Sequence, residues 1–156
     1  MGQAWEHQPV MVNEVVQWMN PSAKKVYVDG TLGDGGHSEA ILEASSPDGI
    51  VVGVDVDDDA IRSARDRLRR FGERFQTVQG NFRRLSSLLQ DAPVFSREEA
   101  KADGILFDLG GSTRQFLSPE RGFSLTADGP LDMRMDRTLP VTAADVVAEE
   151  REDRLA

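Results

Sequence analysis

A glycine-rich run between a short apolar stretch and a helical pattern restricts the fold of this chain more than any other feature. The run extends from Asp29 to Ser38 (DGTLGDGGHS), and Asp55 ends the next apolar stretch, twenty residues after Gly35. Glycines let backbone amides approach a ligand closely, and a carboxylate at the end of the following strand can accept two ribose hydroxyls. The pattern predicts a cradle for a nucleotide-type cofactor. The alternative is a strand-to-helix turn that uses glycine only to reach positive φ.

The apolar periodicity predicts alternating strands and helices. Strands are expected at residues 26–29, 50–55, 75–79 and 104–108, and helices at 12–19, 36–44, 57–71 and 83–90. The apolar middle of the last strand predicts burial on both faces. The alternation indicates an α/β fold, a parallel sheet with helices on both sides.

After Asp108 the alternation stops. About 34 residues, from 109 to 142, show no sustained period, and such long connections are usually functional or disordered. Residues 142–156 read as one helix with Thr142 as its cap.

Composition narrows the functional classes. The chain has no cysteine and two histidines, so disulfides and thiolate metal sites are excluded, and no metal site is expected. The net charge of −9 argues against binding RNA through its phosphates. Eight arginines stand between Arg62 and Arg84, and pairing with neighbouring carboxylates is the favoured interpretation for those up to Arg70. Arg83 and Arg84 differ because they follow the carboxyl end of the third strand, where ligands bind in such sheets.

No apolar run is long enough to cross a membrane, and the first residues lack the features of a secretory signal or a transit peptide. A cytoplasmic location is therefore expected, with the mitochondrial matrix as the alternative.

Several motifs, in order along the chain, together resemble one family. They are His7–Val10, the glycine loop, Asn81-Phe82, residues 103–110, Glu120–Ser124 and Asp128–Asp136. The chain resembles, from about residue 7 to 148, the S-adenosylmethionine-dependent methyltransferases that modify N4 of a cytidine in small-subunit ribosomal RNA. The resemblance implies a Rossmann-like class I methyltransferase fold, S-adenosylmethionine as cofactor, and small-subunit ribosomal RNA or the ribosomal subunit as partner.

The resemblance also implies roles for individual residues. Gly35, Gly36 and His37 would hold the methionine part of the cofactor, and Asp55 would accept the ribose hydroxyls. Phe82 would lie against the adenine, Asp108 would stand where cofactor and target base meet, and Gln115 would complete that edge. Asp108 is also the catalytic candidate, as an acceptor for a proton of the cytosine amine. A backbone carbonyl of residues 109–111 could do the same, and Asp108 would then only orient the cofactor.

The resemblance divides the chain into a cofactor-binding half (1–108), an active-site loop region (109–141) and the start of an inserted helical domain (142–156). In the loop region, Arg121, Arg134 and Arg137 could contact phosphates or pair internally with Glu120, Asp132 and Asp136. Asp34 departs from the family pattern, and its charge beside the cofactor's carboxylate would weaken binding.

Proteins of this family are about twice as long as this chain. The resemblance therefore implies a fragment or short isoform in which strands 5–7 are missing, and strand 104–108 would be an open edge that permits dimerisation. Two alternatives to the enzyme remain. One is a catalytically inactive module that binds S-adenosylmethionine or RNA. The other is a dinucleotide dehydrogenase, because Gly33, Gly35 and Ser38 approximate that fingerprint.

Overall fold

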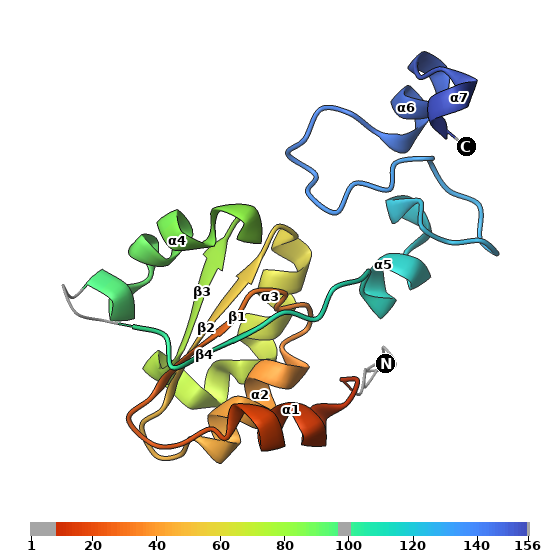
Figure 1. Ribbon diagram of the computed structural model, residues 1–156. Coiled ribbons are helices and arrows are strands. Elements are labelled where there is room, and N and C mark those ends of the chain that lie inside the picture. Colours follow the sequence, from red (N-terminus) through yellow and green to blue (C-terminus); the bar gives the residue numbers. More distant parts are fainter. Residues whose placement is uncertain (1–8, 97–100, 156) are drawn as a thin grey trace. The chain divides into compact units, whose positions relative to one another are not determined.

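A four-stranded parallel sheet forms the centre of the first part of the chain. The computed structural model describes residues 9–96 and 101–155 (Figure 1). The strands are β1 (Val26–Asp29), β2 (Ile50–Asp55), β3 (Phe75–Gln79) and β4 (Gly104–Leu106), in the order β3-β2-β1-β4. Asp29 pairs in register with Gly53 of β2 and with Leu106 of β4. All carboxyl ends therefore meet at one edge, which we call the carboxyl edge.

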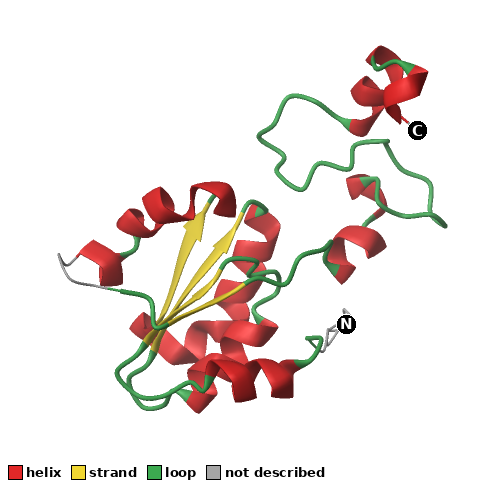
Figure 2. Cartoon of the chain, viewed as in Figure 1, coloured by secondary structure: helices red, strands yellow, loops and turns green. Residues whose placement is uncertain are grey.

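Helices cover both faces of this sheet, as the alternation predicts (Figures 1 and 2). The α-helices of this part are α1 (Val12–Met19), α2 (Gly36–Ala44), α3 (Asp58–Leu68) and α4 (Leu85–Leu88). Short 3₁₀ helices are η1 (Arg69–Arg74), η2 (Phe82–Arg84), η3 (Leu89–Asp91) and η4 (Pro93–Ser96).

The alternation of side chains along the strands builds a core on each face. Val51 packs with Ile41, Leu42 and Leu68 of α2 and α3 on one face. Val28, Val52 and Val54 point to the other face, where leucines of α4 and η3 cover them. Successive strand residues face opposite sides, so neighbours on β2 serve different cores.

Two predicted helices differ in detail. The helix predicted at 57–71 begins as expected, because the side chain of Asp57 accepts a hydrogen bond from Asp59 N–H (3.1 Å) and caps α3. It ends at Leu68 and continues as η1, which contains Gly72 at φ +56°. The helix predicted at 83–90 is a succession of η2, α4 and η3. Ser87 Oγ donates to the carbonyl of Arg84 there, and such local bonds compete with a regular helix.

The burial predicted for the fourth strand is wrong. β4 is shorter than residues 104–108, and the side chain of Ile105 is 50% exposed. Among the described residues β4 pairs only with β1, so its other edge has no strand beside it. An apolar run predicts a strand but not the neighbours that bury it.

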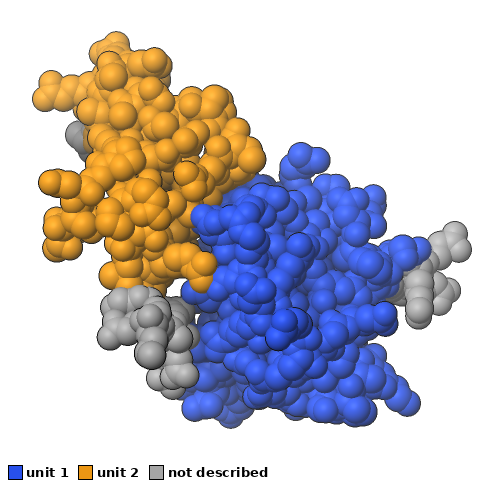
Figure 3. All heavy atoms as spheres, turned by 180° about the vertical axis from the view of Figure 1, so that it is seen from behind, with its two compact units in different colours: residues 1–109 blue, residues 110–156 orange. Residues whose placement is uncertain are grey.

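Figure 3 colours the two compact units of the chain, residues 1–109 and 110–156. The second unit contains α5 (Thr113–Leu117), η5 (Pro119–Arg121), α6 (Ala143–Glu149) and α7 (Glu152–Leu155). Thr142 caps α6 as predicted, accepting from Asp145 N–H (3.2 Å). The single helix predicted at 142–156 is wrong, because Glu150 adopts an extended conformation (ψ 150°) between α6 and α7.

A buried arginine organises the loop of the second unit. Arg121 is 3% exposed, and its guanidinium donates to the carbonyls of Arg134 (3.0 Å) and Met135 (3.3 Å). Close backbone packing accompanies it: a Cβ on Gly122 would lie 2.2 Å from the carbonyl oxygen of Pro130. Nothing in the described part of the chain forms a helix long and apolar enough to span a membrane.

Candidate cofactor-binding site

The glycine loop joins β1 to α2 at the carboxyl edge. Gly33 (φ +51°) and Gly35 (φ +79°) adopt the left-handed conformation that glycine permits. A Cβ on Gly35 would lie 3.0 Å from a methyl of Leu68 and 3.1 Å from Cβ of Ala64, both on α3. Tight packing against α3 and the positive φ therefore both favour glycine at position 35, independently of any ligand.

Asp55, at the tip of β2, is tied to this loop. One carboxylate oxygen accepts a hydrogen bond from Gly33 N–H, and the other accepts from Asp57 N–H, each at 2.9 Å. Burial is the main cause that raises the pKa of Asp55 above its usual value. Each oxygen keeps a second lone-pair direction, so the group can still accept hydroxyl donors. The structure thus brings the predicted ribose acceptor and the predicted cradle together.

Sequence reasoning missed a buried carboxylate beneath the loop. Asp29 is 1% exposed, and it accepts from Ser38 Oγ (2.7 Å) and from Thr31 N–H (3.3 Å). Burial raises its pKa, and the bond from Ser38 acts in the opposite direction. The available signal was an acid that ends an apolar strand, followed nine residues later by a serine in the first turn of the helix. The pair anchors α2 to the tip of β1.

Asp108 lies just beyond β4 and is fixed through its backbone. Its N–H donates to Thr31 Oγ1 (2.6 Å), while its side chain stays 46% exposed. One carboxylate oxygen is 3.9 Å from Nδ1 of His37. The carboxylate is therefore held at the rim of the glycine loop and is open to a ligand.

The buried ring of His37 has a structural role. Its Nε2 lies 2.8 Å from the carbonyl oxygen of Val10, which can only accept, so Nε2 carries the proton. Pro9 packs against the neighbouring Gly36, where an added Cβ would lie 3.0 Å from the Pro9 ring. His7, which belongs to the same motif, lies outside the described residues.

Phe82 lies in η2, directly after β3, with 39% of its side chain exposed. Its ring contacts Phe107, with centroids 5.3 Å apart and the planes inclined by 58°. Phe107 precedes Asp108 and is 44% exposed. The structure thus places an apolar aromatic surface at the carboxyl edge, and the sequence reasoning had identified only its Phe82 half.

Gln115 lies in the second unit, so its predicted place at the site stays a prediction. It is 5% exposed, and its side-chain oxygen accepts from Ser112 N–H (3.1 Å), which caps α5. The internal interpretation, pairing with a carboxylate of the loop, holds for Arg134. Arg134 forms an ion pair with Asp132 (2.7 Å), and Arg121 binds carbonyls.

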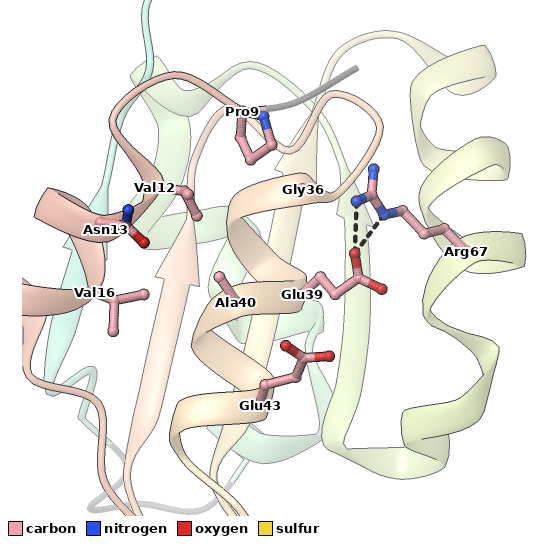
Figure 4. A pocket seen from close by; sticks show the side chains of 9 residues that line it. All are labelled: Pro9, Val12, Asn13, Val16, Gly36, Glu39, Ala40, Glu43 and Arg67. Carbon is pink, nitrogen blue, oxygen red and sulfur yellow. Dashed lines mark hydrogen bonds and ion pairs between the residues drawn. The ribbon is translucent and has the colours of Figure 1, made fainter. Parts of the chain in front are cut away.

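An open hollow of about 400 Å³ lies over α1, α2 and α3 (Figure 4). Pro9, Val12 and Val16 face Gly36 and Ala40 across it. Arg67 occupies one side through its ion pair with Glu39 (2.6 Å). Of the candidate site residues, Gly36 borders this hollow, whereas Asp55, Phe82 and Asp108 do not line it. Among residues 9–96 and 101–155, no three His, Asp or Glu side chains gather as a metal site.

The comparison with family models decides which proteins this chain is related to. Residues 4–156 match the model described as the MraW methylase family. The chain belongs to this family. Membership confirms the family that the motifs predicted.

Two of these relatives carry the name ribosomal RNA small subunit methyltransferase H. The protein from Geobacter sulfurreducens is 47% identical over 152 residues, which are 97% of this chain and 47% of the relative. The protein from Trichlorobacter lovleyi is 46% identical over 145 residues, 93% of this chain and 45% of the relative. The chain spans about half the length of the curated relatives it matches.

A solved structure supports the fold. The crystal structure of NSun6 from Pyrococcus horikoshii with SFG, an S-adenosylmethionine analogue, superimposes with a TM-score of 0.53 at 22% identity. The match covers 66% of this chain and 24% of NSun6. Together with the parallel order β3-β2-β1-β4, this confirms the predicted Rossmann-like methyltransferase fold.

Proposed function

We propose that this chain takes part in the S-adenosylmethionine-dependent methylation of N4 of a cytidine in small-subunit ribosomal RNA. The observation that carries the proposal is the hydrogen bond from Gly33 N–H to the Asp55 carboxylate (2.9 Å). It holds the group that would accept the ribose hydroxyls beside the loop that would take the methionine part. The names of the curated relatives support the same substrate class.

The charge of the site favours this cofactor over a dinucleotide. Residues 30–61 contain no lysine or arginine, while Asp55 and Asp57 place carboxylates beside the loop. A pyrophosphate would be repelled there, whereas a sulfonium cation would be attracted. Gly35, Gly36 and His37 would offer backbone groups to the methionine part, and the dehydrogenase alternative loses its support.

When bound, S-adenosylmethionine supplies a methyl group on a cationic sulfur that an amine can displace in line. The chain has to orient the acceptor nitrogen and exclude water. The lone pair of the cytosine amine is delocalised into the ring, so an acceptor for one of its protons assists attack. We assign this task to Asp108, whose half-exposed carboxylate is placed at the loop by the bond from its backbone N–H to Thr31.

Further parts of the proposal concern the surroundings of the reaction. The cytidine has to be unstacked, because a paired base hides its amine. Gln115 would complete the site, residues 109–141 would line it, and residues 142–156 would open a helical insertion. We place the activity in the cytoplasm. The exposed edge of β4, where Ile105 is half exposed, supports pairing of two copies as a further proposal.

Calorimetric titration with S-adenosylmethionine tests the cofactor assignment. Asp55→Asn removes the charge but keeps one acceptor oxygen. Asp55→Ala removes the charge and both oxygens. We expect binding to weaken by about 10- to 100-fold, since hydrogen bonds to charged groups contribute about 1.5–3 kcal/mol. Asp66→Ala is the matched control, because Asp66 is an exposed carboxylate on α3.

Transfer of a labelled methyl group to small-subunit ribosomal RNA tests the activity. We expect the wild-type chain to transfer the methyl group. Asp108→Asn should bind the cofactor but not transfer the methyl group. Saturable cofactor binding without transfer would instead favour the inactive binding module. A folded wild-type chain that does not bind the cofactor would overturn the proposal.

A further inference from the structure

Two half-exposed aromatic rings lie in contact at the carboxyl edge. Phe82 follows β3 and Phe107 follows β4, so residues from the two outer strands of the described sheet meet there. Neither ring belongs to the core clusters of the described residues. Large apolar groups that stay exposed together mark contact surfaces more often than isolated ones do. The ring pair is therefore a candidate contact surface.

Phe107 is held in place by its two chain neighbours. The carbonyl of Leu106 accepts from Gly30 N–H (2.9 Å), and Asp108 N–H donates to Thr31 Oγ1 (2.6 Å). The Phe107 ring lies over Gly30, where an added Cβ would come within 2.2 Å of a ring carbon. The ring therefore covers the start of the glycine loop. The pairing of β1 and β4 fixes its position.

The other groups at this edge have a different chemistry. Asp55 and Asp108 present carboxylates, and Gly33 and Gly35 present backbone groups. An aromatic surface favours a planar ring, because aromatic rings stack on one another or make edge contacts. The ribose acceptor Asp55 ends β2, and β2 lies next to β3, which leads into Phe82. A base attached to that ribose would reach the ring pair.

We propose that Phe107 is a cofactor-binding residue, which together with Phe82 contacts the adenine of S-adenosylmethionine. The inference rests on the proposed function and adds a residue to its site. The adenine contact requires an aromatic ring at position 107. An aliphatic side chain would still cover Gly30, but it has no π face for the adenine.

Titration of Phe107 variants with S-adenosylhomocysteine and with 5′-methylthioadenosine tests the inference, since both ligands carry adenine. We expect Phe107→Leu to weaken the binding of both by about 3- to 30-fold, as base stacking on aromatic side chains predicts. Phe107→Tyr should restore most of the affinity. The matched control is Phe95→Leu, which removes a partly buried ring from the core cluster beside α4. It should lower thermal stability and leave affinity unchanged.

Three outcomes would overturn the inference. In the first, Phe107→Leu binds both ligands like the wild-type chain while Asp55→Asn loses binding, and the proposed function then stands without this residue. In the second, Phe107→Leu loses affinity but Phe107→Tyr does not restore it, which indicates a role in packing over Gly30. In the third, the folded wild-type chain binds neither ligand, and the proposed function fails with it.

Discussion

Three aspartates at the carboxyl edge are held by different means. Asp55 is fixed by backbone N–H groups and Asp29 mainly by a buried hydroxyl, whereas Asp108 is anchored by its own backbone. The carboxylates of Asp55 and Asp29 therefore need little reordering when a ligand arrives, and preorganisation of this kind favours affinity. The same burial makes Asp29 and Asp55 costly to ionise.

The raised pKa of Asp29 predicts a pH dependence of stability. Its contribution is fully present below its ordinary pKa of 3.8 and is lost as pH rises through the raised pKa of the folded state. Asp29→Asn does not titrate. The free energy of unfolding of the wild-type chain, minus that of Asp29→Asn, should therefore fall as pH rises above about 4. Urea unfolding at several pH values measures it.

Asp103→Asn provides a control of opposite sign. Lys25 donates to Asp103 (2.6 Å) and lowers the pKa of that carboxyl. Its contribution is present above pH 3.8 and is lost as pH falls through the lowered pKa. If the difference in unfolding free energy between the wild-type chain and Asp29→Asn did not change as pH rises above about 4, the assignment of Asp29 as a buried carboxyl with a raised pKa would be contradicted.

Arginines connect the elements on one face of the sheet. Glu39 of α2 accepts from Arg67 of α3 (2.6 Å) and from Arg70 of η1 (2.7 Å). Arg74 donates to the carbonyls of Leu42 in α2 (2.5 Å) and of Gly49 in the turn before β2 (2.8 Å), and so ties the end of η1 to both. Pairing within α3, as the sequence suggested, is found for Arg62 with Asp58 and Asp59.

Arg74→Met should destabilise the first unit. It leaves two partly buried carbonyls without donors, which costs about 1–3 kcal/mol. Arg69→Met is the matched control, since Arg69 is exposed at the start of η1, and its change should stay within about 0.5 kcal/mol. Urea unfolding followed by circular dichroism measures both. Equal effects of the two substitutions would contradict the bracing role of Arg74.

The sequence predicted the elements of the first unit better than their contacts. The bounds of α1, α2 and β1 to β3 agree with the structure, because apolar period, glycine and capping residues act locally. The exposure of Ile105 and the contact between Phe82 and Phe107 depend on which strands lie side by side. Asp29 was missed for the same reason, since its burial follows from pairing with both β2 and β4.

Each of the two units contains its own stabilising contacts. The first relies on the apolar cores of the sheet, and the second on polar contacts around Arg121 and on an edge contact between Phe116 and Phe123 (centroids 5.9 Å apart). The division of the chain into 1–108, 109–141 and 142–156 remains a prediction.

Arg121→Met should loosen the second unit alone. The substitution leaves the carbonyls of Arg134 and Met135 without their buried donor, and apolar packing cannot replace these bonds. Hydrogen exchange should accelerate within residues 110–149 and stay unchanged in β1 and β2. Arg114→Met is the comparison, because it alters an arginine on α5 and should leave most of the unit protected. Loss of protection in β1 would contradict independent stabilisation.

The position of β1 between β2 and β4 has a consequence for the order in which the chain folds. β1 and β2 pair residues that are 24 apart, Val26 with Ile50, whereas Thr31 and Asp108 are separated by 77 positions. Longer loops close with a larger loss of entropy, and contacts between distant residues form later. The glycine loop and Asp55 can therefore come together early. The surface that Phe107 and Asp108 provide forms only when β4 docks, so the ability to bind a ligand should appear at the end of folding.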